Sequence, residues 1–264
     1  MKKNVIIATL MLGTFGLSAT GCSGNNQEKA VAEVITEPAA ETKEVIFKQG
    51  KLIEVAFLSV EAGKEKQLNE EYFAKVMPVA MEYGMKPLLT IGVQNSWSEN
   101  TKPQMVGFFE WPSIAKKVAF EKDERFLELK KIRNSALSFL KVGFYEVEKD
   151  MSVQLDKDKF YEIYGMTMNK EKGHLMDKYF EKAGPLCMNE YKVDFALSMK
   201  PVCVIGYDCA SDEVFTSQVF GIAIWPNAEA NSKYFSSEKY AEIKHYKEDA
   251  LEQMDAWQGS VILK

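Results

Sequence analysis

The sequence predicts an α+β fold made of two tandem copies of one unit, each an antiparallel sheet that carries helices on one face. Two observations lead to this fold class. A set of landmarks occurs twice in the same order, and strand-type and helix-type apolar spacing alternate within each copy. The chain has 264 residues, of which 46% are hydrophobic. That length and apolar fraction are sufficient for two small units with packed cores.

The repeated landmarks are a Tyr six residues before a Pro and a Trp-Pro pair. Tyr72–Pro78 recurs 107 positions later as Tyr179–Pro185. Trp111-Pro112 recurs 114 positions later as Trp225-Pro226. Landmarks that keep their order and nearly their spacing indicate a duplication. The larger second offset predicts a seven-residue insertion in the second copy, within 200–217.

Each copy is predicted as strand, helix, two strands, helix and strand. Apolar residues alternate in the strands and recur at three- and four-residue spacing in the helices. Pro78 removes one hydrogen bond from the first helix and is expected to bend it. In the first copy the predicted strands are Leu52–Val60, Leu88–Val93, Met105–Trp111 and Val142–Val147, and the predicted helices are Lys64–Tyr83, a short one from Pro112, and Glu124–Leu140. The second copy repeats these elements from Tyr161 to Leu263.

A strand–helix–strand that occurs twice is the split βαβ or ferredoxin-like unit. The Tyr-to-Pro helix and the strand that ends in Trp-Pro resemble the dimeric α+β barrel superfamily, and within it a group of small proteins of unknown function. The resemblance covers 52–263. It implies two sheets packed face to face, formed here within one chain as a monomer or completed in a homodimer. Members include antibiotic-biosynthesis-type monooxygenases, haem-degrading enzymes, muconolactone isomerases and chlorite dismutases, so the resemblance implies no single activity.

The N-terminus has the features of a targeting segment. Lys2 and Lys3 precede a short apolar stretch, Val5–Leu17, which is followed by small residues and then Cys22. This arrangement resembles the lipobox of bacterial lipoproteins, which implies cleavage before Cys22 and acylation of that residue with palmitate-type chains. The alternative is an ordinary secretory signal that contains a Cys.

These features divide the chain into four predicted parts. They are a signal peptide at 1–21, a lipidated flexible tether at 22–50, and ferredoxin-like repeats at 51–149 and 150–264. The tether is expected because its first half has no aromatic residue and cannot bury enough area to order itself. The expected location is the bacterial cell envelope, with the lipid bilayer as a partner through Cys22. In a Gram-negative host that is the outer membrane, facing the periplasm or the surface.

Composition excludes several functions. The excess of 38 acidic over 33 basic residues argues against a nucleic-acid surface. There are only two His, and both His174 and His245 fall opposite the apolar faces of their predicted helices. We therefore expect no metal site and no cofactor, including the haem that some members of the superfamily bind.

The three cysteines after Cys22 lie in the second copy. An envelope location permits one disulfide, and Cys203 with Cys209 is the nearest pair. Cys187 would then remain free. Three buried thiols without a disulfide are an equal alternative.

The best candidates for a ligand site are Arg133 and its repeat partner Lys247. At about 100° per residue, each falls within the apolar face of its predicted helix and has no acid at i±4. A cation on such a face needs compensation. A bound carboxylate would supply it; so would a carboxylate from another strand, or a side chain that reaches the helix edge.

Trp111 and Trp225 end strands beside these helices and are candidates to wall the same pocket, although they could equally fill the core. Glu110 has an Ile counterpart, Ile224, and no matched acid is expected to face the pocket. The predicted function is therefore an envelope lipoprotein that binds a small, partly apolar molecule, with a carboxylate as one candidate. The alternatives are a cofactor-less monooxygenase- or isomerase-like enzyme and an envelope scaffold, and the sequence does not decide whether the protein is an enzyme.

Overall fold

The computed structural model describes residues 42–204 and 206–263. The predicted signal peptide and the predicted lipidation site Cys22 therefore lie outside the described residues. Within the described ranges, no helix combines the length and the apolar character that a membrane crossing requires.

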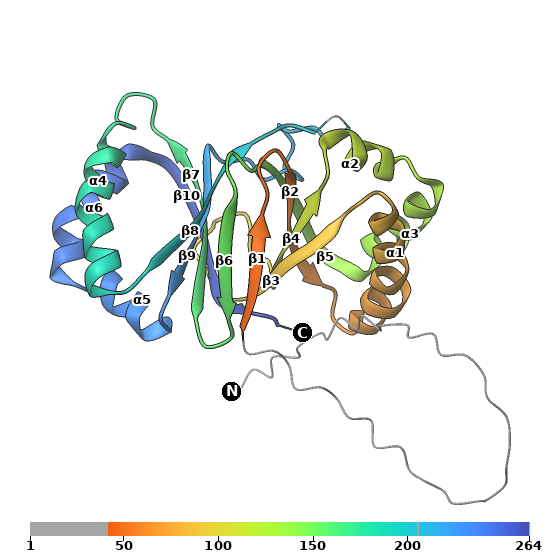
Figure 1. Ribbon diagram of the computed structural model, residues 1–264, viewed down its shortest axis with the longest axis horizontal. Coiled ribbons are helices and arrows are strands. Elements are labelled where there is room, and N and C mark those ends of the chain that lie inside the picture. The colour runs from red at the N-terminus through yellow and green to blue at the C-terminus, as the bar shows by residue number, and fades with distance from the viewer. Residues whose placement is uncertain (1–41, 205, 264) are drawn as a thin grey trace, which may run out of the picture.

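Eight antiparallel strands close into one barrel, and each repeat contributes four of them (Figure 1). The order around the barrel is β10-β3-β4-β2-β5-β8-β9-β7. The first repeat supplies β2 (Leu52–Val60), β3 (Lys86–Ser96), β4 (Met105–Trp111) and β5 (Leu137–Glu146). The second supplies β7 (Phe160–Met168), β8 (Asp194–Pro201), β9 (Val219–Trp225) and β10 (Leu251–Val261). This arrangement confirms the predicted α+β class of two tandem ferredoxin-like units.

The helices form two layers on opposite sides of the barrel (Figure 1). The first repeat carries α1 (Ala74–Glu82), α2 (Ile114–Glu121) and α3 (Glu124–Ala136). The second carries α4 (Leu175–Pro185), α5 (Ala228–Phe235) and α6 (Glu238–Ala250). A π-helical segment precedes α1 at Gln67–Phe73 and another follows α4 at Leu186–Glu190. Each four-stranded sheet therefore has helices on one face and the barrel interior on the other.

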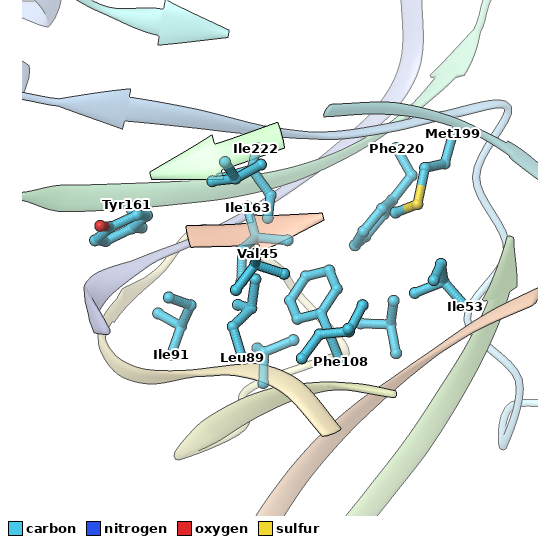
Figure 2. Close-up of a cluster of buried hydrophobic side chains, with 14 of the residues drawn as sticks. Val45, Ile53, Leu89, Ile91, Phe108, Tyr161, Ile163, Met199, Phe220 and Ile222 are labelled. Carbon is cyan, nitrogen blue, oxygen red and sulfur yellow. The ribbon is translucent and has the colours of Figure 1, made fainter. Parts of the chain in front are cut away.

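The barrel interior is one apolar core shared by both repeats. Strand alternation sends every second side chain inward, so Ile53 of β2 shares one core with Ile163 of β7 and Phe220 of β9 (Figure 2). Val55 and Phe57 of β2 belong to the same core. The rings of Phe57 and Trp257 lie 4.5 Å apart. Because the core contains residues of both sheets, neither repeat can bury its inner face alone.

A separate two-stranded sheet packs against this core. β1 (Thr42–Phe47) pairs antiparallel with β6 (Met151–Asp156). Val45, Phe47 and Val153 point into the shared core. The predicted tether at 22–50 is therefore wrong for 42–50, because Val45 and Phe47 alternate with polar residues and bury themselves as a strand does.

The long helices end earlier than predicted. Apolar spacing predicted that the first would extend to Leu140 and placed residues as far as Trp257 on its counterpart, but α3 ends at Ala136 and α6 at Ala250. β5 and β10 begin at the next residue in each case. No Gly or Pro marks these boundaries, and pairing with the first strand of each repeat decides them.

The two joints between the repeats differ. β10 and β3 pair along Trp257–Val261, whereas β5 and β8 pair only at Tyr145–Pro201 and Glu146–Lys200. The loop after β8, in the range 200–217 where the insertion was predicted, packs at the joint with the shorter pairing: the Val142 amide donates to the Glu213 carbonyl at 3.0 Å. The disulfide joins Cys203 to Cys209 within this loop, and Cys187 is a buried free thiol.

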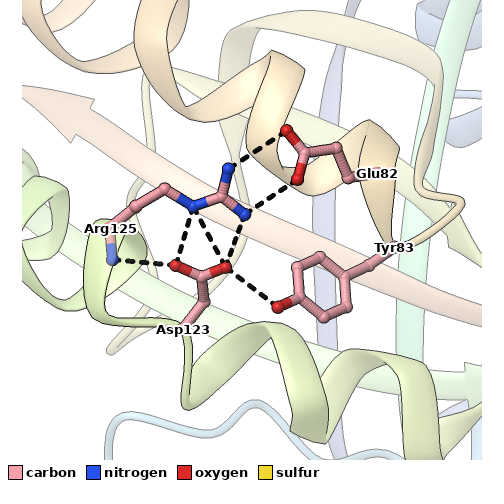
Figure 3. A network of polar contacts seen from close by, with 4 residues as sticks. All are labelled: Glu82, Tyr83, Asp123 and Arg125. Carbon is pink, nitrogen blue, oxygen red and sulfur yellow. Dashed lines mark hydrogen bonds and ion pairs between the residues drawn. The ribbon is translucent and has the colours of Figure 1, made fainter.

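A polar cluster fixes the helices of the first repeat to one another. Arg125, at the start of α3, pairs with Glu82 at the end of α1 and with Asp123, which caps α3 (Figure 3). Tyr83 donates to the same Asp123 carboxylate at 2.9 Å. The Arg125 guanidinium holds the pKa of Asp123 well below its usual range.

Candidate functional site

Each repeat has a small cavity between its sheet and its helices, at equivalent places. The strand face opposite the barrel core supplies the floor, and it carries a glutamate at the third position of β2 (Glu54) and of β7 (Glu162). The cavities occupy about 80 Å³ in the first repeat and about 50 Å³ in the second. Trp111 and Arg133 line the first, and Trp225 and Lys247 line the second, so the structure brings each predicted pair together.

In the first repeat the glutamate belongs to a closed network of ion pairs. The Lys117 ammonium, on a side chain only 3% exposed, lies 2.9 Å from Glu54 and 2.7 Å from Glu121. It also lies 4.9 Å from the ring centre of Trp111, whose Nε1 donates to Glu54 at 2.8 Å. Every charge here has a partner, which is the condition for burying charge at acceptable cost.

The insertion of the second repeat completes this network. Tyr207, between the two disulfide cysteines, donates to the Glu121 carboxylate at 2.6 Å. Burial raises the pKa of Tyr207 well above its usual range, and the nearby carboxylates of Glu54 and Glu121 add to the effect. Tyr207 therefore remains a proton donor at neutral pH.

In the second repeat the glutamate has no such cation. Asn231 occupies the α5 position equivalent to that of Lys117 on α2. It donates to Glu162 at 3.0 Å, and Gln258 donates to the same oxygen at 2.6 Å. Burial raises the pKa of Glu162, while the two amides and Lys247 oppose the rise. The carboxyl group is thus buried among neutral partners and is more easily protonated than an exposed glutamate.

Trp225 also differs from Trp111 in the hydrogen bonding of its indole N–H. Its Nε1 is buried without a hydrogen-bond partner, and within the described ranges it is the one buried side-chain N or O atom in that state. Glu162 is turned toward Asn231 and Gln258, so it does not accept from Trp225 as Glu54 accepts from Trp111. A buried unpaired donor is costly and calls for an explanation.

The two predicted cations reach their cavities without forming ion pairs among the described residues. Arg133 donates to the Asn134 side chain at 3.0 and 3.1 Å and lies 5.9 Å from the Phe126 ring centre. The Lys247 ammonium lies 5.3 Å from the ring centre of Tyr240 and 5.7 Å from that of Tyr179. Cation–π contacts therefore supply part of the stabilisation of these two cations that a carboxylate was expected to give.

Neither histidine belongs to a cavity. His174 and His245 are exposed, as the helical-wheel positions predicted, and neither lines the cavity of the second repeat. A haem needs an axial ligand inside its pocket and far more space than these cavities offer. The positions of the histidines and the size of the cavities therefore do not fit a histidine-ligated haem. The described residues also contain no group of three or more His, Cys, Asp or Glu side chains placed to hold a metal ion.

Sequence reasoning missed the acids. The inference that no matched acid lies on the pocket side is wrong, because Glu54 and Glu162 match and both line cavities. The signal was present in Leu-Ile-Glu-Val and Phe-Tyr-Glu-Ile at the start of each copy. Glu110, which was considered instead, is buried and lies 3.6 Å from Lys86.

Comparison with solved structures finds proteins whose fold is similar to that of this chain. It superposes on an anthrone oxidase-like protein with a TM-score of 0.56 and 12% identity, covering 82% of this chain and 94% of the other. A cyanide complex of a mutant chlorite dismutase from Candidatus Nitrospira defluvii gives a TM-score of 0.49, 8% identity and coverage of 82% and 92%. A heme-binding protein from Thermus thermophilus gives a TM-score of 0.40 at 10% identity, covering 86% of this chain and 94% of the other. No protein-family model and no curated protein matches the chain. At these identities the first likeness shows the fold alone.

The tryptophan pair permits a direct test of the unpaired donor. Replacing Trp by Phe removes the N–H and a similar ring area at either site. We expect Trp111→Phe to cost about 1–3 kcal/mol more than Trp225→Phe, because only the former leaves a buried carboxylate short of a donor. Urea unfolding of both variants measures the difference. Equal losses of unfolding free energy would contradict the conclusion that only Trp111 donates a hydrogen bond.

The pH dependence of stability tests the state of Glu162. Because its folded pKa lies above the ordinary value of 4.5, the stability it contributes is present at low pH and is lost as pH rises through the folded pKa. Wild type should therefore lose stability relative to Glu162→Gln as pH rises from about 4 to 8. Unfolding midpoints of the two proteins across that range measure the trend; a constant difference would mean that the pKa is not raised.

Proposed function

We propose that the protein is a cell-envelope lipoprotein that binds a small, mainly apolar carboxylic acid in the cavity of the second repeat. The observation that carries the proposal is the buried, unpaired Nε1 of Trp225, which lines that cavity. A ligand oxygen that accepts from it would remove the cost of the unpaired donor. Lys247, which has no ion pair among the described residues, would supply the charge for a carboxylate.

The rest of the cavity suits the apolar part of such a ligand. Its remaining walls are mostly aromatic or aliphatic, and they include Tyr164, Met166 and Cys187. Phe180 and Phe195, also in the lining, are 44% and 46% exposed. The small enclosed volume admits a carboxylate or carbonyl group, with the apolar remainder between these two rings. Glu162, when protonated, would add a second donor to the ligand oxygen.

The first repeat is the weaker candidate for the same role. Trp111 is already paired with Glu54, and Lys117 is already compensated by two carboxylates. Arg133 remains at the cavity wall, where it has no carboxylate partner among the described residues and contacts the Asn134 amide and the Phe126 ring. A ligand there would gain one cation but no unpaired donor, so the proposal assigns the principal site to Trp225 and Lys247.

Native mass spectrometry of the full-length protein, purified gently from its own host, tests the binding role. We expect an added mass of a small organic acid that disappears on denaturation. Trp225→Phe and Lys247→Leu should lose that mass or weaken its retention by about tenfold, the effect of one charge-assisted hydrogen bond. Trp111→Phe is the matched control. A bare protein mass, or the mass of haem, would contradict the proposal.

Membrane attachment through acylated Cys22 is a separate part of the proposal. It rests on the lipobox-like sequence before Cys22, and the Cys203–Cys209 disulfide is compatible with an oxidising envelope. Labelling of growing cells with a palmitate analogue should mark the wild-type protein and not Cys22→Ser. Equal labelling, or none in wild type, would argue for an ordinary secretory signal.

One observation favours catalysis as a second candidate. Glu162 is a buried carboxyl with a raised pKa beside a cavity, which is the arrangement a general acid or base requires. A cofactor-less oxygenase or isomerase would use it to move a proton on the bound molecule. In that case the ligand released by the wild-type protein would be chemically altered, and Glu162→Gln would bind it unaltered.

A further inference from the structure

A second, open cleft lies beside the second repeat, between α5 and the loop that joins β3 to β4. It has a volume of about 460 Å³. Trp97 of the loop and Phe235 of α5 contribute aromatic rings, 5.8 Å apart. Asn95, Ser232 and Gln258 are among the polar residues along it, and all of the residues that the structure places there are uncharged. This cleft and the cavity assigned above to an acid are separate hollows on either side of Phe235, which lines both.

Trp97 is exposed although its loop is firmly held. The side chain is 60% exposed. The loop around it is fixed by buried polar groups: Ser98 donates to Asp255, the Thr101 amide donates to Ser98 at 3.1 Å, and Trp257 donates to the Thr101 carbonyl at 2.8 Å. A large aromatic ring presented to solvent by an ordered loop is typical of a binding residue, because little conformational entropy remains to be lost on contact.

The equivalent place on the other side of the barrel has a smaller cleft of about 220 Å³, and its lining includes the charged residues Glu121, Lys130 and Asp208. The loop between β8 and β9 crosses to the first repeat, where Tyr207 contacts Glu121 of α2. In the same way, the loop between β3 and β4 crosses to the second repeat, where Trp97 contacts Phe235 of α5. Glu121 and Phe235 are repeat equivalents, 114 residues apart. Tyr207 is hydrogen-bonded and partly buried, whereas Trp97 stands open. The larger volume and the uncharged lining are therefore specific to the cleft beside Trp97 and do not follow from the fold.

We propose that this cleft binds a neutral carbohydrate, with the face of a sugar ring against Trp97. The aliphatic C–H face of a pyranose is attracted to the negative face of an indole ring. Amide and hydroxyl side chains match sugar hydroxyls as donors and acceptors. The Gln258 Oε1 accepts no hydrogen bond from the described residues and the Asn95 side chain is exposed, so both have free capacity. The lack of charged residues in the lining favours a neutral glycan over an anionic one.

Titration of the full-length protein with cellohexaose, chitohexaose and maltohexaose, followed calorimetrically, tests the proposal. We expect saturable binding of at least one hexasaccharide, weakened about tenfold or more in Trp97→Ala, as for other aromatic hot spots. Asn95→Ala should weaken it less. Leu127→Ala, which removes an exposed apolar side chain from α3, is the control and should bind as wild type does.

Three results would overturn the inference. One is the lack of saturation by every hexasaccharide at millimolar concentration, the weak end of specific binding. Another is binding that Trp97→Ala leaves unchanged. The third is a change of oligomeric mass in Trp97→Ala without an effect on sugar binding, which would identify the cleft as a contact between copies of the chain. None of these depends on the acid-binding cavity, which Trp225→Phe tests separately.

Discussion

A carboxylate lies beneath the helices of each repeat, and its compensation shapes both sites. Glu54 is neutralised by Lys117, and this requires Glu121, Trp111 and Tyr207 to complete the hydrogen bonds around a buried ammonium. Glu162 is stabilised by neutral amides instead, which leaves its pKa raised and Trp225 without an acceptor. Two differences on the second helix, Lys117 against Asn231 and Glu121 against Phe235, thus separate a filled network from an incomplete one.

The shared barrel core makes these sites rigid. Both glutamates stand on strands whose opposite faces are locked into the barrel interior. A strand held on one face cannot shift its register without moving every inward side chain to the wrong side. The positions of Glu54 and Glu162 are therefore fixed by Ile53, Val55 and Ile163 as firmly as by their own partners.

The fold was largely predictable from the sequence, because duplication and apolar alternation are local signals. Trp111 and Trp225 identified the ends of equivalent strands, and both strands end there. The helix ends were not predictable, since Leu137 and Leu251 continue an apolar pattern that either structure satisfies. The pairing of β1 with β6 joins residues about a hundred positions apart and has no local signal.

The site was predictable only in part. Helical spacing placed Arg133 and Lys247 at the cavities, because that argument concerns one helix face. The glutamates were missed because an acid in a β-rich run looks like a solvent-facing residue until helices are known to cover that face. The hydroxyl that donates to Glu121 could not be found from local sequence, since Tyr207 comes from the other repeat.

The exchange of loops between the repeats has an evolutionary consequence. In a symmetric dimer of single units, one gene would encode both sites, and any substitution would appear in both. Once two copies are fused, Tyr207 and Trp97 can be selected independently, although each completes a surface on the other copy. Fusion thus permits one half to become a structural support while the other acquires a new specificity. On this account the disulfide-bonded insertion of the second repeat records specialisation of the first repeat, whose closed network it completes.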